Sequence, residues 1–294
     1  MNTGKTVFSQ ILEHLPRYEF DKFVKKYEGN CRVRRFPCYD QFLCLAYAQL
    51  TYRQSLRDIE TCLNSHREKL YHIGFRGQIS RSTMADAGEK RDCRIYQDFA
   101  YHLISIARRL YQNEELAIDL DYSLYAFDST TIDLCLSLFP WAHFRKTKAA
   151  IKMHTFLDLR GSIPTFISLT TGKVHDVNVL DILPLEKDAV VAMDRGYVDF
   201  TRLYAMNRFP AFFVIRAKSN LRYRRIHSQK VDKSLGLRSD QHIVLTTKKS
   251  RDAYPEALRR VTYVDLDTNK GFVYLTNIFT VPAITVADIY KQRW

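Results

Sequence analysis

Near residue 120 the spacing of the apolar residues changes, and this change constrains the fold more than any other feature of the chain. Up to residue 115, apolar side chains recur at helical spacing, as in Phe99, Leu103 and Ile106. Beyond residue 120, short apolar runs of the β-strand type alternate with turn-forming residues and helical stretches. The sequence therefore predicts an all-helical N-terminal domain, residues 1–115, followed by an α/β domain, residues 116–294.

The second part of the chain predicts a mixed sheet. Arg160-Gly161-Ser162 forms a turn between two apolar runs, which is a good hairpin signal. The expected elements are a strand at 124–127, a hairpin at 154–169, strands at 189–193 and 211–215, and helices at 176–188 and 198–208. Strands and helices that alternate in this way are typical of an α/β architecture.

Residues 216–280 are basic and rich in strand-forming patterns. The Lys and Arg residues of the first half of this stretch far outnumber its acids, and a second hairpin turn lies at 267–270. We expect a mostly antiparallel insertion with an exposed basic face. Such a face suits phosphate groups, with Arg222, Arg224 and Arg225 as DNA contacts, although a solvated hairpin arm would carry the same pattern.

The charge of the whole chain gives the first indication of a partner. It has 45 Lys and Arg residues against 32 Asp and Glu residues, a formal net charge of +13. A surplus of this size favours a polyanion such as DNA, because each phosphate that is neutralised releases condensed counterions. A basic protein kept soluble by its charge would show the same balance.

Nothing in the sequence indicates a membrane protein. The first residues lead into the amphipathic stretch Val7–Leu15, which is unlike a signal peptide, and no run of about 18 apolar residues follows. The six cysteines include no C-x2-C pair, and we expect them to be reduced core residues. A cytoplasmic, nucleoid-associated protein with no membrane partner is the expectation.

The N-terminal part contains a pattern that resembles a helix-turn-helix. A helical stretch at 55–60 is followed by a break at Gly74–Gly77 and by a second helical stretch at 79–87. The second helix of such a motif enters the major groove of DNA. Because any capped pair of helices looks similar, the sequence leaves open whether residues 1–115 bind DNA.

Two aspartates stand out by position. Asp128 and Asp194 each follow an apolar run and precede small or turn-forming residues. Ligands bind at the carboxyl ends of strands in open α/β sheets, and phosphodiester chemistry uses paired carboxylates that hold divalent ions. We therefore predict that both residues are catalytic metal ligands on neighbouring central strands. Taken singly, either aspartate would fit a helix cap or a turn equally well.

The residues around these aspartates bring a family into view. Phe127-Asp128-Ser129-Thr130, Asp194-Arg195-Gly196-Tyr197 and Tyr290-Lys291-Gln292-Arg293 resemble the insertion-sequence-4 family of DDE transposases. The resemblance implies a ribonuclease-H-like core with a β-rich insertion before the final helix. It matches Asp128 and Asp194 to the first two acids of the catalytic triad. Tyr290 and Arg293 match the first two positions of the signature Y-x2-R-x3-E-x6-K, and we expect them to contact DNA.

The resemblance also implies an activity and a cofactor. A DNA transposase binds the terminal repeats of its element as double-stranded DNA, cleaves a phosphodiester at each end and joins the 3′-ends to target DNA. Mg²⁺ or Mn²⁺ is the implied cofactor, with two ions in a complete site. Self-association on DNA is left open.

The glutamate of the signature would fall four positions after Arg293, beyond the last residue, Trp294. We therefore expect these residues to bind DNA without cutting it. A truncated DNA-binding relic, or an inhibitor of the full-length transposase, is the alternative, and a nuclease on the same core is a third hypothesis. The final stretch, 284–294, is predicted to begin a helix capped by Thr285.

Other side chains are weaker candidates. Arg195 follows Asp194 directly and is expected to contact DNA. Arg145, Lys146 and Lys148 are assigned to a loop that could hold DNA or could simply be solvated. His175 precedes a predicted helix and either lies near the metal site or only flanks a helix cap.

Overall fold

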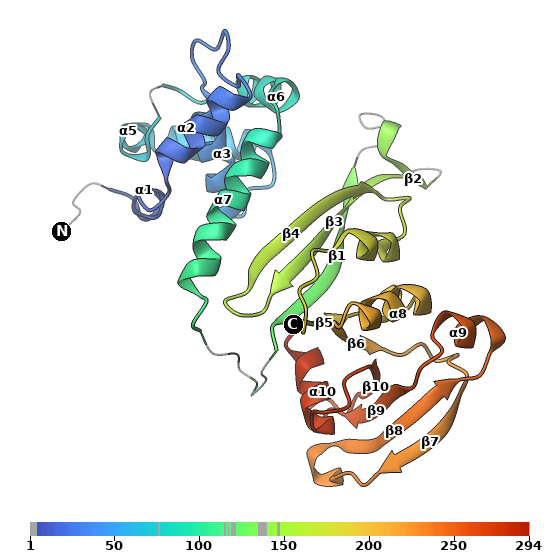
Figure 1. Ribbon diagram of the computed structural model, residues 1–294. Coiled ribbons are helices and arrows are strands. Elements are labelled where there is room, and N and C mark those ends of the chain that lie inside the picture. Colours follow the sequence, from blue (N-terminus) through green and yellow to red (C-terminus); the bar gives the residue numbers. More distant parts are fainter. Residues whose placement is uncertain are drawn as a thin grey trace. The chain divides into compact units, whose positions relative to one another are not determined.

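The computed structural model describes residues 5–75, 77–114, 116, 118, 122–134, 140–145 and 148–293. The chain forms two compact units, one up to Ile106 and one from Ala107 onward (Figure 1). Lys146 and Trp294 lie outside the described residues, and only the backbone is described for Arg145 and Lys148. No helix in the described part of the chain is both long enough and apolar enough to cross a membrane.

The N-terminal unit is helical, as the spacing of its apolar residues predicts. Its helices are α1 (Val7–Leu12), α2 (Arg17–Lys26), α3 (Cys38–Leu50), α4 (Leu56–Ser65), α5 (Leu70–Ile73), α6 (Arg81–Lys90) and α7 (Arg94–Leu110). Phe20, Phe42 and Phe99 meet in its core, with Phe99 edge-to-face to Phe20 at 5.1 Å and to Phe42 at 5.5 Å between ring centroids. Such contacts join α2, α3 and α7.

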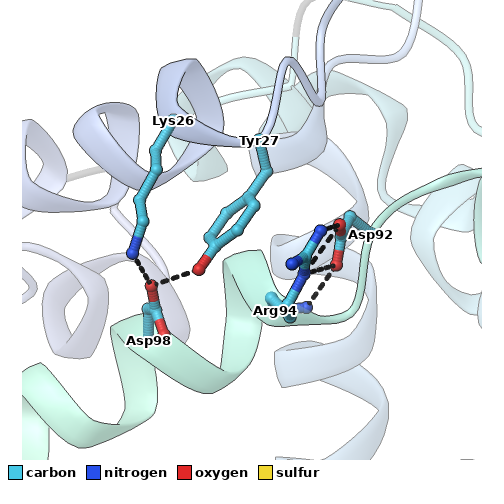
Figure 2. Close-up of polar contacts among 5 residues, drawn as sticks. All are labelled: Lys26, Tyr27, Asp92, Arg94 and Asp98. Carbon is cyan, nitrogen blue, oxygen red and sulfur yellow. Dashed lines mark hydrogen bonds and ion pairs between the residues drawn. The ribbon is translucent and has the colours of Figure 1, made fainter.

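Polar contacts fix the end of α2 against α7 (Figure 2). Lys26 Nζ and the Tyr27 hydroxyl each lie 2.7 Å from the same Asp98 carboxylate oxygen. These two hydrogen bonds, from Lys26 first and Tyr27 second, hold the pKa of Asp98 below its usual value. Arg94 binds both carboxylate oxygens of Asp92 at the start of α7. The start of the segment that follows α2 is therefore held in place against α7.

The second unit is built on one mixed sheet. Its strands are β1 (Leu124–Leu134), β2 (His143–Arg145), β3 (Lys148–Asp158), β4 (Ile163–Thr171), β5 (Val190–Met193), β6 (Phe212–Arg216), β7 (Tyr223–Gln229), β8 (Leu237–Leu245), β9 (Leu258–Val264) and β10 (Gly271–Thr276). Their order is β2-β3-β1-β5-β6-β10-β9-β8-β7, with β4 paired to β3 (Figure 1). β1, β5 and β6 are parallel, and the other pairings are antiparallel. The predicted mixed α/β architecture is confirmed.

Alternation along the central strands separates two hydrophobic cores. Val191 and Met193 of β5 belong to the core that contains Leu203 of α8 (Phe200–Arg208). Val190 and Ala192 belong to the other core, which contains the apolar side chains of α10 (Ala283–Lys291). Successive side chains of a strand point to opposite faces, so each helix covers its own face of the sheet.

The basic, β-rich stretch continues this sheet. β7, β8 and β9 are antiparallel, β9 and β10 form the predicted hairpin, and β10 pairs with the core strand β6. A short helix, α9 (Lys248–Ala253), connects β8 to β9. The antiparallel expectation for residues 216–280 is therefore confirmed, and β10 attaches the stretch to the core.

A buried ion pair links this stretch to the segment before α10. Arg259 on β9 and Asp240 on β8 are each 2% exposed, and the guanidinium binds both carboxylate oxygens at 2.8 and 2.9 Å. The same guanidinium donates to the backbone carbonyls of Ile278 and Val281. It therefore fixes the backbone that leads into α10.

Two expectations about helices are wrong. The helix predicted at 176–188 is a 3-10 helix over Asp176–Ile182 that ends in extended backbone at Leu183, before Pro184, because the residue before a proline disfavours the helical conformation. Thr285 lies inside α10, whose N-cap is Pro282 with no side-chain cap.

β1, the strand that carries Asp128, does not end at residue 127 as predicted. Only its apolar, buried part ends at Phe127, and pairing with β3 continues the strand to Leu134. Of the cysteines expected in a core, Cys31 and Cys93 are exposed.

Replacing Arg259 with Ala leaves Asp240 buried without a counter-charge. We expect Arg259→Ala to lower the free energy of unfolding by about 3–5 kcal/mol, measured by urea denaturation. Arg260→Ala is the matched control, because Arg260 is the half-buried neighbour of Arg259 and contacts the side chains of Gln241 and Thr262 and the ring of Tyr223. Equal losses in the two variants would contradict a special role for the buried pair.

Candidate active site

The parallel register of β1 and β5 brings the two selected aspartates together. Phe127 pairs with Met193, the last pair of this register, so Asp128 and Asp194 are the next residues on the two strands. By alternation, both carboxylates lie on the face that α10 covers. The side chains of Asp128 and Asp194 are 51% and 39% exposed, so both remain accessible to a ligand.

α10 completes this arrangement with Tyr290 and the residue one turn later, Arg293. The Arg293 guanidinium donates to Asp128 Oδ2 at 2.9 Å and to the Tyr290 hydroxyl at 2.9 Å, and it lies 3.8 Å from Asp194 Oδ1. The Tyr290 hydroxyl in turn donates to Asp194 Oδ1 at 3.3 Å. One guanidinium therefore bridges both carboxylates.

Electrostatics favour a cation at this position. The Arg293 side chain is only 3% exposed, and burial alone would lower its pKa. The hydrogen bond to Asp128 and the charges of Asp128 and Asp194 outweigh that effect and raise the pKa of Arg293. The two carboxylates therefore lie close enough together to stabilise a positive charge on a buried side chain.

The donor set fits a hard divalent ion with incomplete protein coordination. Carboxylate oxygens suit Mg²⁺ and Mn²⁺, and Mg²⁺ is commonly held by one or two carboxylates with water or phosphate completing its shell. Within the described residues, no group of three His, Cys, Asp or Glu side chains is placed to hold a metal. Asp158 cannot join the pair, because it is opposite Tyr125 at the other end of β1.

A second polar cluster lies on the opposite face of β1. His154 on β3 is fully buried, its Nε2 is 2.8 Å from the Thr170 hydroxyl, and its ring stacks on Phe127. Burial lowers the pKa of His154. Tyr197 packs against Phe127 from the 3-10 turn that follows Asp194. Phe127, whose ring contacts both His154 and Tyr197, is the residue directly before Asp128.

His154 was not among the predicted site residues; the predicted histidine, His175, is exposed at the start of the 3-10 helix. The signal was available: His154 shares its side of β3 with Phe156, so it stands in an apolar alternation that predicts burial. Lys152, on the same side, lies 3.1 Å from Asp176. His154, Lys152 and Asp176 thus form a polar group beneath the strand that carries Asp128.

A cationic pocket of about 270 Å³ adjoins Asp194 in sequence. Four cations line it: Arg195, Arg216, Lys218 and Arg260. Tyr223 adds an aromatic ring, over which the Arg260 guanidinium lies at 5.1 Å, and no acid lines the pocket. Of these cations only Arg195 was predicted as a DNA contact. Arg216 on β6, Lys218 just after β6, and Arg260 on β9 are brought together by pairings that the sequence does not reveal.

The other predicted DNA contacts have varied positions. Arg222, Arg224 and Arg225 are all exposed, the last two on β7, whose residues are exposed along its whole length. They are therefore free to meet a polyanion. The side chains of Arg145, Lys146 and Lys148 lie outside the described residues.

Comparison with known proteins gives a family context for both parts of the chain. Residues 119–294, more than half of the chain, match the family described as "Transposase DDE domain". Residues 3–76 match a family described as a domain of unknown function, DUF4372.

Individual proteins similar to this chain carry related names. "Putative transposase y4zB" of Sinorhizobium fredii is 28% identical over 214 residues, which are 72% of this chain and 58% of the relative. "Probable transposase for insertion sequence element IS5377" of Geobacillus stearothermophilus is 31% identical over 176 residues, 58% of this chain and 45% of the relative. The chain thus spans about half the length of these relatives. Among solved structures, a piggyBac transposase synaptic complex with hairpin DNA has a TM-score of 0.44 at 10% identity, covering 97% of this chain and 63% of that one.

The lowered pKa of His154 makes stability depend on pH. Its imidazole binds a proton less readily in the folded than in the unfolded chain, whose histidine pKa is about 6.5. The free energy of unfolding should therefore fall as the pH drops below that value. We expect His154→Gln to remove this step, measured as the difference in unfolding free energy between pH 7.5 and 5.5. The exposed His175→Gln is the control and should keep the wild-type difference; an unchanged difference in His154→Gln would refute the assignment.

Proposed function

This chain belongs to the DDE transposase family, and we propose that its second unit binds and cuts DNA at Asp128 and Asp194. The observation that carries the proposal is the shared bridge: one guanidinium, that of Arg293, contacts both carboxylates directly after the last parallel pair of β1 and β5. Ligands in open α/β sheets bind beyond the carboxyl ends of parallel strands, and Asp194 directly follows the end of β5. The proposed core is ribonuclease-H-like, of the insertion-sequence-4 type.

In this proposal Asp128 and Asp194 hold Mg²⁺ or Mn²⁺. A bound divalent ion would activate the attacking oxygen and stabilise the departing one. Tyr290 keeps the Asp194 carboxylate oriented through its hydroxyl, and Arg293 keeps the two carboxylates facing one another. Because α10 supplies both residues, its position on the sheet decides whether the acidic pair is aligned. The 3-10 turn after Asp194 presents Arg195 at the edge of the same site, where a phosphate oxygen could accept its hydrogen bonds.

The proposed partner is double-stranded DNA, as element ends and as target. The cationic pocket next to Asp194 and the exposed basic strand β7 both belong to the second unit. Neither the lining of this pocket nor the sequence of β7 contains an acid. Guanidinium groups bind phosphate in a bidentate way, and aromatic rings such as Tyr223 offer a stacking surface for a base. We propose that the backbone of DNA follows these two features toward the carboxylates. Such a protein would work at the nucleoid.

The alternative is that residues 1–294 bind DNA without cutting it. One observation favours it: the described acids supply two converging carboxylates, and both are engaged by Arg293. A two-carboxylate site should hold metal weakly and with poor geometry. DNA binding, in contrast, depends on the positive charge of residues 1–294 and needs no third carboxylate.

Cleavage and binding assays separate these possibilities. We expect residues 1–294 to shift DNA in a gel but to show no Mg²⁺- or Mn²⁺-dependent nicking of supercoiled plasmid. A longer protein that continues α10 with a helix carrying the glutamate of the signature should nick the plasmid, because the glutamate supplies a third hard ligand. In that extended protein Asp128→Ala should abolish nicking and leave the gel shift unchanged.

Two results would count against the proposal. Nicking that survives Asp128→Ala in the extended protein would show that the chemistry lies elsewhere. Strong Mg²⁺-dependent nicking by residues 1–294, lost in Asp128→Ala, would show that a third ligand is present within them and would reject the binding-only alternative.

The arginines of the β7 region should contribute through charge. Replacing Arg222, Arg224 and Arg225 with Ala should flatten the slope of log affinity against log salt by up to about three units, since each phosphate contact contributes about 0.9. The matched control is Lys248, Lys249 and Arg251 to Ala on α9, which removes the same charge from another exposed element. Equal slopes for the two triple variants would mean that only total charge matters.

A further inference from the structure

The segment between α2 and α3 presents three arginines from a firmly held loop. Arg32, Arg34 and Arg35 are all exposed, and none of them forms an ion pair with any residue in the described part of the chain. We refer to residues 31–35 as the arginine loop. Its charge is therefore available to a partner, in contrast to that of Arg17, which is bound to Asp21.

The arginine loop is anchored at its first end by packing. A Cβ atom on Gly29 would lie 2.4 Å from Ile95 Cδ1 and 2.7 Å from Cys38 Sγ, so the backbone passes against α3 and α7 with no room for a side chain. The Asn30 side chain accepts a hydrogen bond from the Cys38 backbone at 2.8 Å. Together with the contacts of Tyr27 (Figure 2), these interactions fix the start of the loop.

Its second end is held by Arg91, which follows α6. The Arg91 guanidinium donates to the carbonyls of Phe36 and Pro37, directly after the arginine loop, and to the Gln41 side chain. The guanidinium also lies over the Phe36 ring, which is buried. Because both ends are fixed, little conformational freedom remains to be lost when the loop binds a ligand.

The loop forms one wall of a groove of about 920 Å³. Arg34 and Arg35 line it, together with Arg17, whose guanidinium lies over the Tyr39 ring at 3.3 Å, and Gln78 lines it from the segment before α6. The one acid among the lining residues, Asp40, is buried. The groove is therefore basic, and clustered arginines of this kind bind the phosphate backbone of nucleic acids.

We propose that the arginine loop and its groove form a binding site for the phosphate backbone of duplex DNA. The proposal rests on the proposed function, in which DNA is the partner, and it gives a role to the region of residues 3–76. It differs from the helix-turn-helix expectation, in which α6 would read DNA. On α6, Asp86 and Glu89 balance Arg81 and Lys90, so the helix offers no surplus of charge to a phosphate.

The test compares two charge-matched variants of residues 1–294. In the first, Arg32, Arg34 and Arg35 are changed to Gln; in the second, Arg57, Arg81 and Lys90 on α4 and α6 are changed to Gln. Binding of a short fluorescein-labelled random-sequence duplex is followed by anisotropy between about 50 and 200 mM salt. The loop variant should bind more weakly, with a salt slope smaller by about 2.7, since three contacts of about 0.9 are lost. The helix variant should keep the wild-type slope.

Further arms keep the outcomes distinct. Arg32→Lys, Arg34→Lys and Arg35→Lys together should retain the wild-type slope, and matching thermal melts exclude unfolding as the cause of any loss. A wild-type slope in the Gln loop variant, or a loss confined to the helix variant, would overturn the loop assignment while leaving DNA as the partner. Absence of DNA binding by the unaltered chain would instead refute the proposed function.

Discussion

The parallel pairing of β1 with β5 is the constraint on which the second unit depends. Four consecutive pairs, ending at Phe127 and Met193, place two apolar strands side by side at the centre of the sheet. The alternation within these strands assigns one face to α8 and the other to α10. The same alternation decides where the next two side chains point, and those side chains are Asp128 and Asp194. The position of the acidic pair thus follows from the packing of the core.

Much of this arrangement could be predicted from residues alone, because it depends on local patterns. The apolar runs at 189–193 and 211–215 are short, β-branched and bounded by turns, and they are strands β5 and β6. The hairpin turns at 160–162 and 267–270 connect antiparallel partners. The placement of Asp128 and Asp194 on neighbouring strands followed from their position after such runs.

What could not be predicted depends on contacts between distant parts of the chain. β10 pairs with β6 although about 55 residues separate them, and no local signal marks this partner. The bridge made by Arg293 depends on how α10 packs against the sheet, which the sequence pattern of α10 does not specify. His154 was overlooked because a histidine in an apolar alternation reads as an interruption until Phe127 and Thr170 are seen to enclose it.

The Arg259–Asp240 pair has a consequence for how this architecture can be recombined. Because Arg259 also holds the carbonyls of Ile278 and Val281, β8, β9 and the entry to α10 share one buried charge network. If a chimera took β8 and β9 from different relatives, it could leave Arg259 or Asp240 buried without its partner. The basic strands and the last helix therefore form one structural unit. Chimeras of such proteins should be joined before or after this unit and not within it.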